Sequence, residues 1–323
     1  MRRRTLLGML AATPVALVLG CRRGWGPEQG VTGGLRWLAS QQGAEGAWSG
    51  PDQTARVVEA LDHLGAGLAP EGVAMQERAL TWLAAALAAG PLGDDTGDDT
   101  LSTTAIALHT VVHHRGPEGL DRAVSWLLER CPGASDPALD PVVARRVLEA
   151  VQVLIQHGTG LDAERTARLL EAQVTGRARF EQAQARDGGF ALVGAAPVPE
   201  GAAPVADGEA TADGILALLA CGAGGADPAV ASAVEWLRAH HSPDRVPGAA
   251  GAERLWAYRA AAAQALSRTG GSGDWSAALL PQVGAAQQPD GSWVGAATPG
   301  LLDDPLVVTA LALSTVAWAL RVG

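Results

Sequence analysis

The stretch "AAQQPDGSWVG", Ala285 to Gly295, decides the fold of this chain. It ends a helix-like run with two glutamines, turns on Pro-Asp-Gly and then places a tryptophan. The combination recurs in "WLASQQGAEGAW", which ends at Trp48, and in "FEQAQARDGGF", which ends at Phe190. Glycine tolerates backbone conformations that other residues resist, so we expect a tight turn at each copy.

The turn motif belongs to a larger repeat of about 44 residues. Trp37, Trp82 and Trp126 occupy the same place in three helix-like segments and lie 45 and 44 residues apart. A stretch rich in Pro, Gly and Ala, at about 191–208, interrupts the period. When this insertion is allowed for, the position of the repeated tryptophan recurs in three more units, where it is occupied by Leu169, Trp236 and Leu280.

Each unit carries a second helix-like segment that opens with an acidic residue, the favoured charge at a helix N-terminus. These acids are Asp52, Asp98, Asp140, Glu209, Glu253 and Asp303. The segments that begin at Asp98 and Asp303 are apolar or small nearly all round, which indicates buried helices, whereas the tryptophan-bearing segments are charged on one side. We therefore predict an all-α fold, an (α/α)6 toroid of six inner and six outer helices over residues 30–323, with no strands.

Glutamine followed by Gly-x-Trp or Gly-x-Phe resembles the repeat of squalene–hopene cyclases and of the β subunits of protein prenyltransferases. The resemblance covers most of the chain and is specific for the fold. In that family the glutamine amide satisfies free backbone groups at a helix end, and the aromatic ring packs over the neighbouring repeat. The resemblance assigns these structural roles to Gln41, Trp48, Gln184, Phe190, Gln288 and Trp293.

Fold does not determine function, so the chemistry of the family needs its own residues. Family cyclases protonate an isoprenoid with an Asp-x-Asp-Asp-Thr motif, whereas here the alignment on Asp98-Asp99-Thr100 places Thr96 at the first aspartate. Carbocation chemistry also needs aromatic faces, and aromatic residues make up only 4% of the chain. A diverged isoprenoid-transforming enzyme is therefore the alternative function, with Asp98, Asp99 and Asp304 as candidate catalytic residues.

Prenyltransferases of the family hold zinc through Asp, Cys and His, and this sequence lacks the Asp-x-Cys pair. His109 and His113 have the i, i+4 spacing of metal ligands, but the sequence offers no third ligand. Cys221 is interpreted as a small buried thiol. We predict no metal and no cofactor, with Ca²⁺ bound by the Asp-rich loop as the alternative.

The inner helices of a toroid all begin at the same end, so their acidic N-termini converge on the mouth of the axial cavity. The alternative is that these acidic residues only cap the helix N-termini and that water solvates their charges. The candidate mouth residues are Asp98, Asp99, Thr100, Glu209, Asp303 and Asp304.

The N-terminus resembles a bacterial lipoprotein signal. Residues 1–20 combine a basic start with a short apolar run, and Cys21 follows Val-Leu-Gly. We predict that residues 1–20 are cleaved and that 21–29 form a lipidated N-terminus and linker; an ordinary signal with an incidental cysteine is the alternative. The remaining Cys131 and Cys221 make no disulfide framework, and the sequence leaves their pairing open.

The amino-acid composition excludes or disfavours several classes of function. The chain has a formal net charge of −10, which disfavours nucleic acid as a partner. Every basic residue is an arginine, and the absence of lysine excludes Schiff-base chemistry. The leading prediction is a non-catalytic protein, exported and lipid-anchored in the bacterial cell envelope. It binds an apolar, isoprenoid-like ligand or a protein partner at its axial cavity; a structural scaffold without a ligand is a further alternative.

Overall fold

The computed structural model describes residues 25–65, 68–93, 97–130, 139–157, 161–192, 205–249, 252–270, 274–295 and 304–321. Within these ranges the chain forms twelve α-helices and no strand, so the prediction of an all-α fold is confirmed. Several predicted features lie outside the described residues: the signal segment, the lipidation site, one cysteine and one mouth residue, namely 1–20, Cys21, Cys131 and Asp303.

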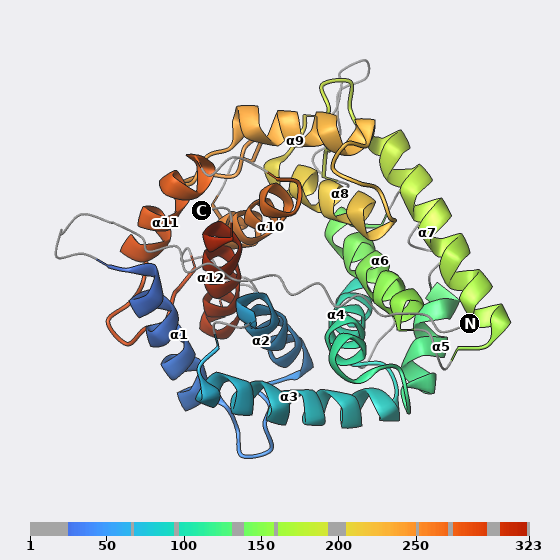
Figure 1. The fold of residues 1–323 in the computed structure, drawn as a ribbon, viewed down its shortest axis with the longest axis horizontal. Helices are drawn as coiled ribbons and strands as arrows, with labels where there is room; N and C mark the ends of the chain where they lie inside the picture. The colour runs from blue at the N-terminus through green and yellow to red at the C-terminus, as the bar shows by residue number, and fades with distance from the viewer. Residues whose placement is uncertain are drawn as a thin grey trace, which may run out of the picture.

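Even-numbered helices occupy the centre of the molecule and odd-numbered helices surround them (Figure 1). The central helices are α2 (Pro51–Leu64), α4 (Asp98–Arg115), α6 (Pro141–Gln156), α8 (Gly208–Ala220), α10 (Leu255–Arg268) and α12 (Pro305–Leu320). The peripheral helices are α1 (Pro27–Gln41), α3 (Pro70–Ala89), α5 (Asp121–Arg130), α7 (Ala163–Ala183), α9 (Pro228–His240) and α11 (Asp274–Ala285).

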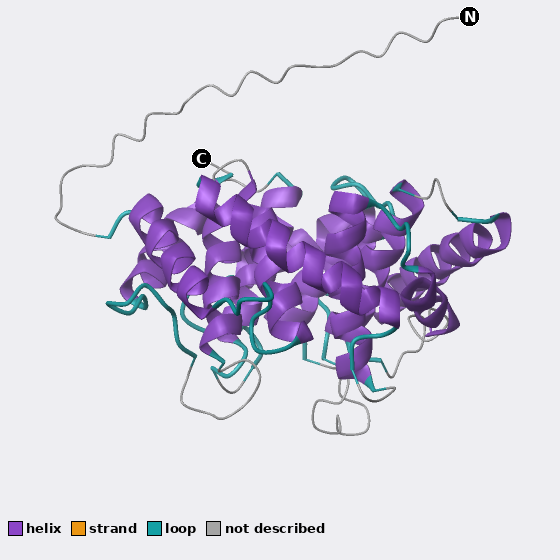
Figure 2. Cartoon of the chain, turned by 90° about the horizontal axis from the view of Figure 1, so that it is seen from below, coloured by secondary structure: helices purple, strands orange, loops and turns teal. Residues whose placement is uncertain are grey.

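The central helices contact one another in circular order. Each packs against the next along the chain, and α12 packs against α2, so that the last central helix meets the first. Seen from the side, the helices form a single flat layer whose loops emerge on its two broad faces (Figure 2). Every residue of α8 is buried, whereas α1 buries only one narrow face, as the distribution of charge in the sequence predicts.

Aspartate side chains cap several central helices as expected from their acidic starts. The carboxylate of Asp140 accepts a hydrogen bond from the backbone N–H of Val142, and that of Asp304 accepts from Leu306. In α8 the cap is Asp207, two residues before Glu209, and it accepts from two backbone N–H groups. These bonds satisfy N–H groups that have no partner inside the helix.

The three glutamine motifs make the same pair of contacts. Gln184 Nε2 donates to Gly188 O at 2.9 Å, closing its own turn, and to Ala229 O of α9 at 2.8 Å. In the first motif Gln42 donates to Gly46 O at 2.8 Å and to Met75 O of α3 at 2.9 Å. Each glutamine thus joins its turn to the first part of the next peripheral helix.

The third motif joins the two ends of the chain, because Gln287 Nε2 donates to Gly291 O at 3.0 Å and to Gly30 O of α1 at 2.9 Å. The role predicted for Gln41 and Gln288 therefore belongs to Gln42 and Gln287. Gln42 is the C-cap of α1 with an extended backbone, so its amide turns away from the helix towards α3. Gln41 is still helical, and its side-chain amide bonds only the neighbouring Ser40 among the residues described.

The glycines of the motifs bring two backbones into contact. Gly46, Gly188 and Gly291 have φ angles of +99°, +92° and +97°. A Cβ atom on any of them would lie 2.4–2.8 Å from a backbone carbonyl oxygen of the next peripheral helix. Glycine is therefore required both by the backbone angle and by the close approach.

The aromatic rings of the motifs are fully buried, and their backbones are held by threonines of the central helices. The backbone N–H groups of Trp48, Phe190 and Trp293 donate to the hydroxyls of threonines at 2.9, 3.0 and 3.0 Å; the acceptors are Thr54, Thr211 and Thr309. The same bond joins Leu92 N to Thr104 Oγ1 at 2.9 Å. The α3–α4 unit thus has the same hydrogen bond from backbone to threonine, with a leucine in place of the aromatic residue. A motif defined by its aromatic residue does not include this copy.

Candidate functional site

An axial cavity of about 240 Å³ lies between the central helices. Side chains from all six of them line it, and most of the polar ones are charged. Among the described residues that line it there is no Trp, Tyr or Phe. The charged lining comprises Arg56, Glu59, Asp99, Asp140, Arg145, Arg146, Glu209, Asp213 and Arg254.

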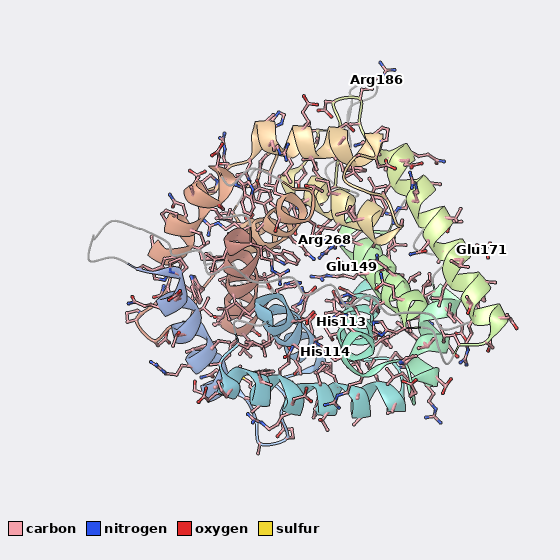
Figure 3. All side chains as sticks on the ribbon, in the orientation of Figure 1. His113, His114, Glu149, Glu171, Arg186 and Arg268 are labelled. Carbon is pink, nitrogen blue, oxygen red and sulfur yellow. The ribbon has the colours of Figure 1, made fainter. Side chains whose placement is uncertain are left out.

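A buried charge network crosses the cavity from α2 through α6 to α8. Arg146 pairs with Glu59 of α2 and lies 3.4 Å from Glu149, which is one turn further along α6. Arg145 pairs with Glu149 at 3.2 Å and with Asp213 of α8 at 2.8 Å. All five side chains are less than a tenth exposed. Figure 3 shows Glu149 pointing towards the centre of the ring.

The arginines determine the ionisation of the first two carboxylates. Burial by itself raises the pKa of Glu59, but the Arg146 guanidinium more than offsets it and holds the pKa below its ordinary value. Burial likewise opposes ionisation of Glu149, and Arg145 and Arg146 lower its pKa. Both groups are therefore carboxylates at neutral pH.

A second cluster surrounds the N-terminus of α8. Arg254 donates to Asp207 Oδ2 and to Glu209 Oε2, both at 2.7 Å. Burial, together with the charge of Asp213, raises the pKa of Glu209 to about 8. Burial raises the pKa of Asp213 to about 6, although Arg145 opposes the shift. On the α8 side of the cavity, the positive charge of the nearby arginines is therefore too small to offset the effect of burial on the pKa values of Glu209 and Asp213.

Three buried polar atoms of the cavity walls have no hydrogen-bond partner among the described residues: Arg145 Nε, Arg146 Nε and Asp213 Oδ1. Arg145 Nε and Asp213 Oδ1 attract each other at 2.8 Å, but their geometry is not that of a hydrogen bond. Unsatisfied buried polar groups are rare and costly, so a polar molecule in the cavity would stabilise them.

The structure brings two of the predicted mouth residues to this cavity. Asp99 and Glu209 line it, the first exposed and the second 4% exposed. Asp98 is exposed and is not part of the lining, and Thr100 is buried beside Gly93. Asp304 also lies outside the lining, where its carboxylate caps α12 and accepts from Gln53 Nε2 at 3.2 Å.

Sequence reasoning missed most of the charged residues that meet in the cavity. A signal was present, because these charges interrupt apolar runs of the predicted inner helices, as in "DPVVARRVLEAVQVL". Charged residues are almost never fully buried unless they are paired. The missed residues are Arg56, Glu59, Arg145, Arg146, Glu149, Asp213 and Arg254.

A third histidine lies close to the His109 and His113 pair of α4, but the described residues form no metal site. The His109 and His113 ring centroids lie 6.4 Å apart, and His157 lies 6.0 Å from His113. No group of three or more His, Cys, Asp or Glu side chains in the described ranges is placed to hold a metal ion. Burial raises the pKa of the half-buried Cys221 thiol to about 12, which makes it unreactive.

A second cavity, the α1–α3 groove, has a volume of about 740 Å³. It lies between α1 and α3 over the C-terminal ends of α2 and α12, and its walls are largely apolar, with Val31, Leu35, Leu64, Met75 and Leu320. Among the helices of the described ranges, none combines the length and the apolar character needed to cross a membrane.

Comparison with known proteins shows a similarity of fold to solved structures. No protein-family model matches the chain, and no curated protein sequence is significantly similar to it. A crystal structure of a protein from Actinoplanes is similar, with a TM-score of 0.57 and 16% sequence identity, over 91% of this chain and 100% of that chain. At this level of identity the similarity is one of fold alone.

Proposed function

We propose that this chain is a non-catalytic binding protein with an (α/α)6 toroid of six helix-pair repeats, and that its ligand occupies the axial cavity. The circular contacts of the central helices and the recurring glutamine, glycine and threonine connections support the six-repeat toroid. The observation that carries the binding role is the convergence of charged side chains from different central helices on one cavity. Buried ion pairs contribute little net stability, so a function is the better reason for them.

The lining favours a small polar ligand. The sequence predicts an apolar, isoprenoid-like molecule or a protein partner, but an apolar molecule in this cavity would remove water from carboxylates and guanidinium groups without replacing their hydrogen bonds. An apolar ligand is better suited to the α1–α3 groove, whose larger volume falls in the range of about 300–1,000 Å³ typical of ligand pockets.

A diverged enzyme is the second candidate, and the raised pKa values of Glu209 and Asp213 are the observation in its favour. A carboxyl group that keeps its proton near neutral pH is suited to act as a general acid. The candidate acids are then these two residues rather than Asp98, Asp99 and Asp304. The described lining contains no aromatic ring, which argues against a carbocation intermediate in this cavity.

The predicted lipid anchor at Cys21 places the protein on the bacterial envelope membrane. Expression of the full chain and of Cys21→Ser in a bacterial host tests it. We expect the unsubstituted chain in the membrane fraction with incorporated labelled fatty acid, and the variant without the label. Equal fractionation and no label in either chain would contradict the anchor and leave the binding proposal unaffected.

Cavity-filling variants test the binding proposal. Ala257→Leu and Ala261→Leu introduce bulk on the cavity-facing side of α10 without removing a charge, and Ala39→Leu is the matched control in the α1–α3 groove. Thermal shift with a panel of small polar molecules and isoprenoid alcohols gives the readout. We expect polar ligands to stabilise the chain and the α10 variants to lose this effect while Ala39→Leu retains it.

Two results would overturn the proposal. One is stabilisation that survives in both α10 variants, which would place the ligand elsewhere. The other is turnover of an isoprenoid by the purified protein that disappears in Glu209→Gln or Asp213→Asn, which would establish the enzymatic alternative.

A further inference from the structure

The axial cavity and the cluster at its α8 side hold more buried carboxylates than guanidinium groups. Three arginines, Arg145, Arg146 and Arg254, are shared among five buried carboxylates, namely Glu59, Glu149, Asp207, Glu209 and Asp213. Acidic residues therefore outnumber basic ones in the part of the site that water reaches least.

Other charged groups facing the cavity do not remove this excess. Arg56 is paired with Asp52 of its own helix at 2.9 Å, and Asp99 and Asp140 add negative charge at the rim. Burial lowers the pKa of His63 to about 4, so this histidine is neutral at pH 7. Arg268 of α10 projects towards Glu149 (Figure 3), but it is an exposed residue whose positive charge water screens, and it makes no ion pair with a carboxylate of α8 among the described residues.

The excess is concentrated on α8. Glu209 and Asp213 are one helical turn apart, so their side chains lie on the same face, and both line the cavity. Among the described residues each has one arginine within ion-pair distance: Arg145 divides its charge between Asp213 and Glu149, and Arg254 divides its charge between Glu209 and Asp207. Asp213 is 1% exposed, and its Oδ1 atom lacks a hydrogen bond.

Building on the proposed function, we infer that the axial cavity binds a small organic cation, a primary amine or guanidinium compound, with its positive charge between Glu209 and Asp213. An ammonium group would supply the N–H donors and the charge that this side of the cavity lacks. The volume of about 240 Å³ restricts the ligand to a compact metabolite, because pockets for larger molecules span about 300–1,000 Å³.

Binding of a cation is coupled to loss of a proton. The pKa of Glu209 is about 8 in the unliganded chain, so this carboxyl is mostly protonated at pH 7. A neighbouring positive charge stabilises the carboxylate and lowers its pKa. Below pH 8 the cation therefore displaces a proton, and its affinity rises as the pH increases from 6 to 8.

Isothermal titration calorimetry with three molecules that share a four-carbon chain tests whether the ligand must carry a positive charge. They are 1,4-diaminobutane, the neutral 1,4-butanediol and the anionic succinate. We expect only the diamine to bind, with proton release in buffers of different ionisation enthalpy at pH 7. Glu209→Gln should weaken binding about tenfold and abolish the proton release, and Asp213→Asn should weaken binding similarly, which corresponds to a loss of about 1.4 kcal/mol of binding free energy in each variant.

The exposed Glu253→Gln is the matched control and should bind as the unsubstituted chain does. Equal binding of butanediol or succinate, absence of diamine binding, or diamine binding that is unchanged in both α8 variants would overturn the inference. If succinate binds and Ala261→Leu abolishes its binding, the inference that the ligand is a cation is wrong, and the proposed binding function of the cavity still holds. If no polar molecule binds at the cavity at all, the proposed function fails as well. Circular dichroism of each variant separates loss of binding from loss of folding.

Discussion

At the scale of single residues, one glutamine joins the two ends of the chain. Gln287 bonds the Gly30 carbonyl of α1, closes its own turn at Gly291 and accepts from Trp25 Nε1 at 2.7 Å. Its neighbour Gln288 is exposed, and within the described part of the chain its side-chain amide bonds only the Ala286 carbonyl. Two adjacent residues of identical chemistry thus differ completely in structural role.

Substitution of the two glutamines measures this difference. We expect Gln287→Ala to lower the free energy of unfolding by about 1–3 kcal/mol, because backbone acceptors and the Trp25 N–H lose their partner. Gln288→Ala should change it by less than about 0.5 kcal/mol, as surface substitutions do. Urea denaturation followed by tryptophan fluorescence provides the measurement. Equal effects of the two substitutions would contradict the assigned role.

The aromatic residue of the same motif gives a second prediction at this scale. The Trp293 ring is 0% exposed, and its Nε1 donates to the Val283 carbonyl at 2.8 Å. Trp293→Ala should destabilise the chain by about 3–5 kcal/mol, the usual cost of a large cavity in a core. Trp126→Ala, in a half-buried ring covered by Arg130, should cost clearly less in the same denaturation experiment.

At the scale of elements, α6 is linked to α2 and α8 through charge. Arg146 pairs with Glu59 and Glu149, all of them buried. Arg146→Met should destabilise the chain by about 3–5 kcal/mol, because two carboxylates lose a buried partner. Adding Glu59→Gln to this variant should recover part of the loss. A double variant less stable than Arg146→Met alone would argue against the pairing.

The N-terminus of α8 makes stability depend on pH. The pKa of Glu209 is about 8 in the folded chain, above the ordinary value of 4.5 for a glutamate, so the folded state binds its proton more tightly than the unfolded state. This preference contributes stability at low pH that is lost as the pH rises towards 8. Histidines with lowered pKa values, such as His63, act in the opposite direction, but only below about pH 6.5.

The window from pH 6.5 to 8 therefore isolates the carboxyl group. We expect the unsubstituted chain to lose stability across it, while Glu209→Gln, which does not titrate, stays nearly constant. Thermal unfolding in a series of buffers of equal ionic strength measures the difference, with Glu253→Gln as the control. Parallel profiles for the unsubstituted chain and Glu209→Gln would show that the group does not titrate in this range.

At the scale of the whole molecule, the contact of α12 with α2 separates this architecture from an open stack of helix pairs. Removal of a terminal repeat from an open stack costs mainly the contacts of that repeat. Here α12 packs against α1, α2, α10 and α11, so its loss would expose apolar faces at both ends of the chain. The molecule should therefore unfold as one cooperative unit.

Truncation tests this expectation. A chain of residues 21–304, which lacks α12, should lose cooperative thermal unfolding and amide protection throughout, including in α6 and α8 on the far side of the ring. The reference is a chain of residues 21–323. Retention of native-like hydrogen exchange protection in α6 and α8 of the truncated chain would indicate independent repeats.

The sequence by itself determined the helices, their alternation between buried and amphipathic, and the glycine turns before Trp48, Phe190 and Trp293. These features depend on neighbours within one or two helical turns, and hydrophobic periodicity and helix-capping preferences report such local interactions directly. The tertiary structure decided which glutamine of each adjacent pair bonds the next helix, because the direction of each side chain depends on the residue at which the helix ends: Gln42 is the extended C-cap of α1, and Gln287 and Gln288 both lie beyond the end of α11. It also decided that Glu59, Arg146 and Asp213 form one network. Their separation along the chain conceals their proximity, and each of them alone resembles a solvated charge.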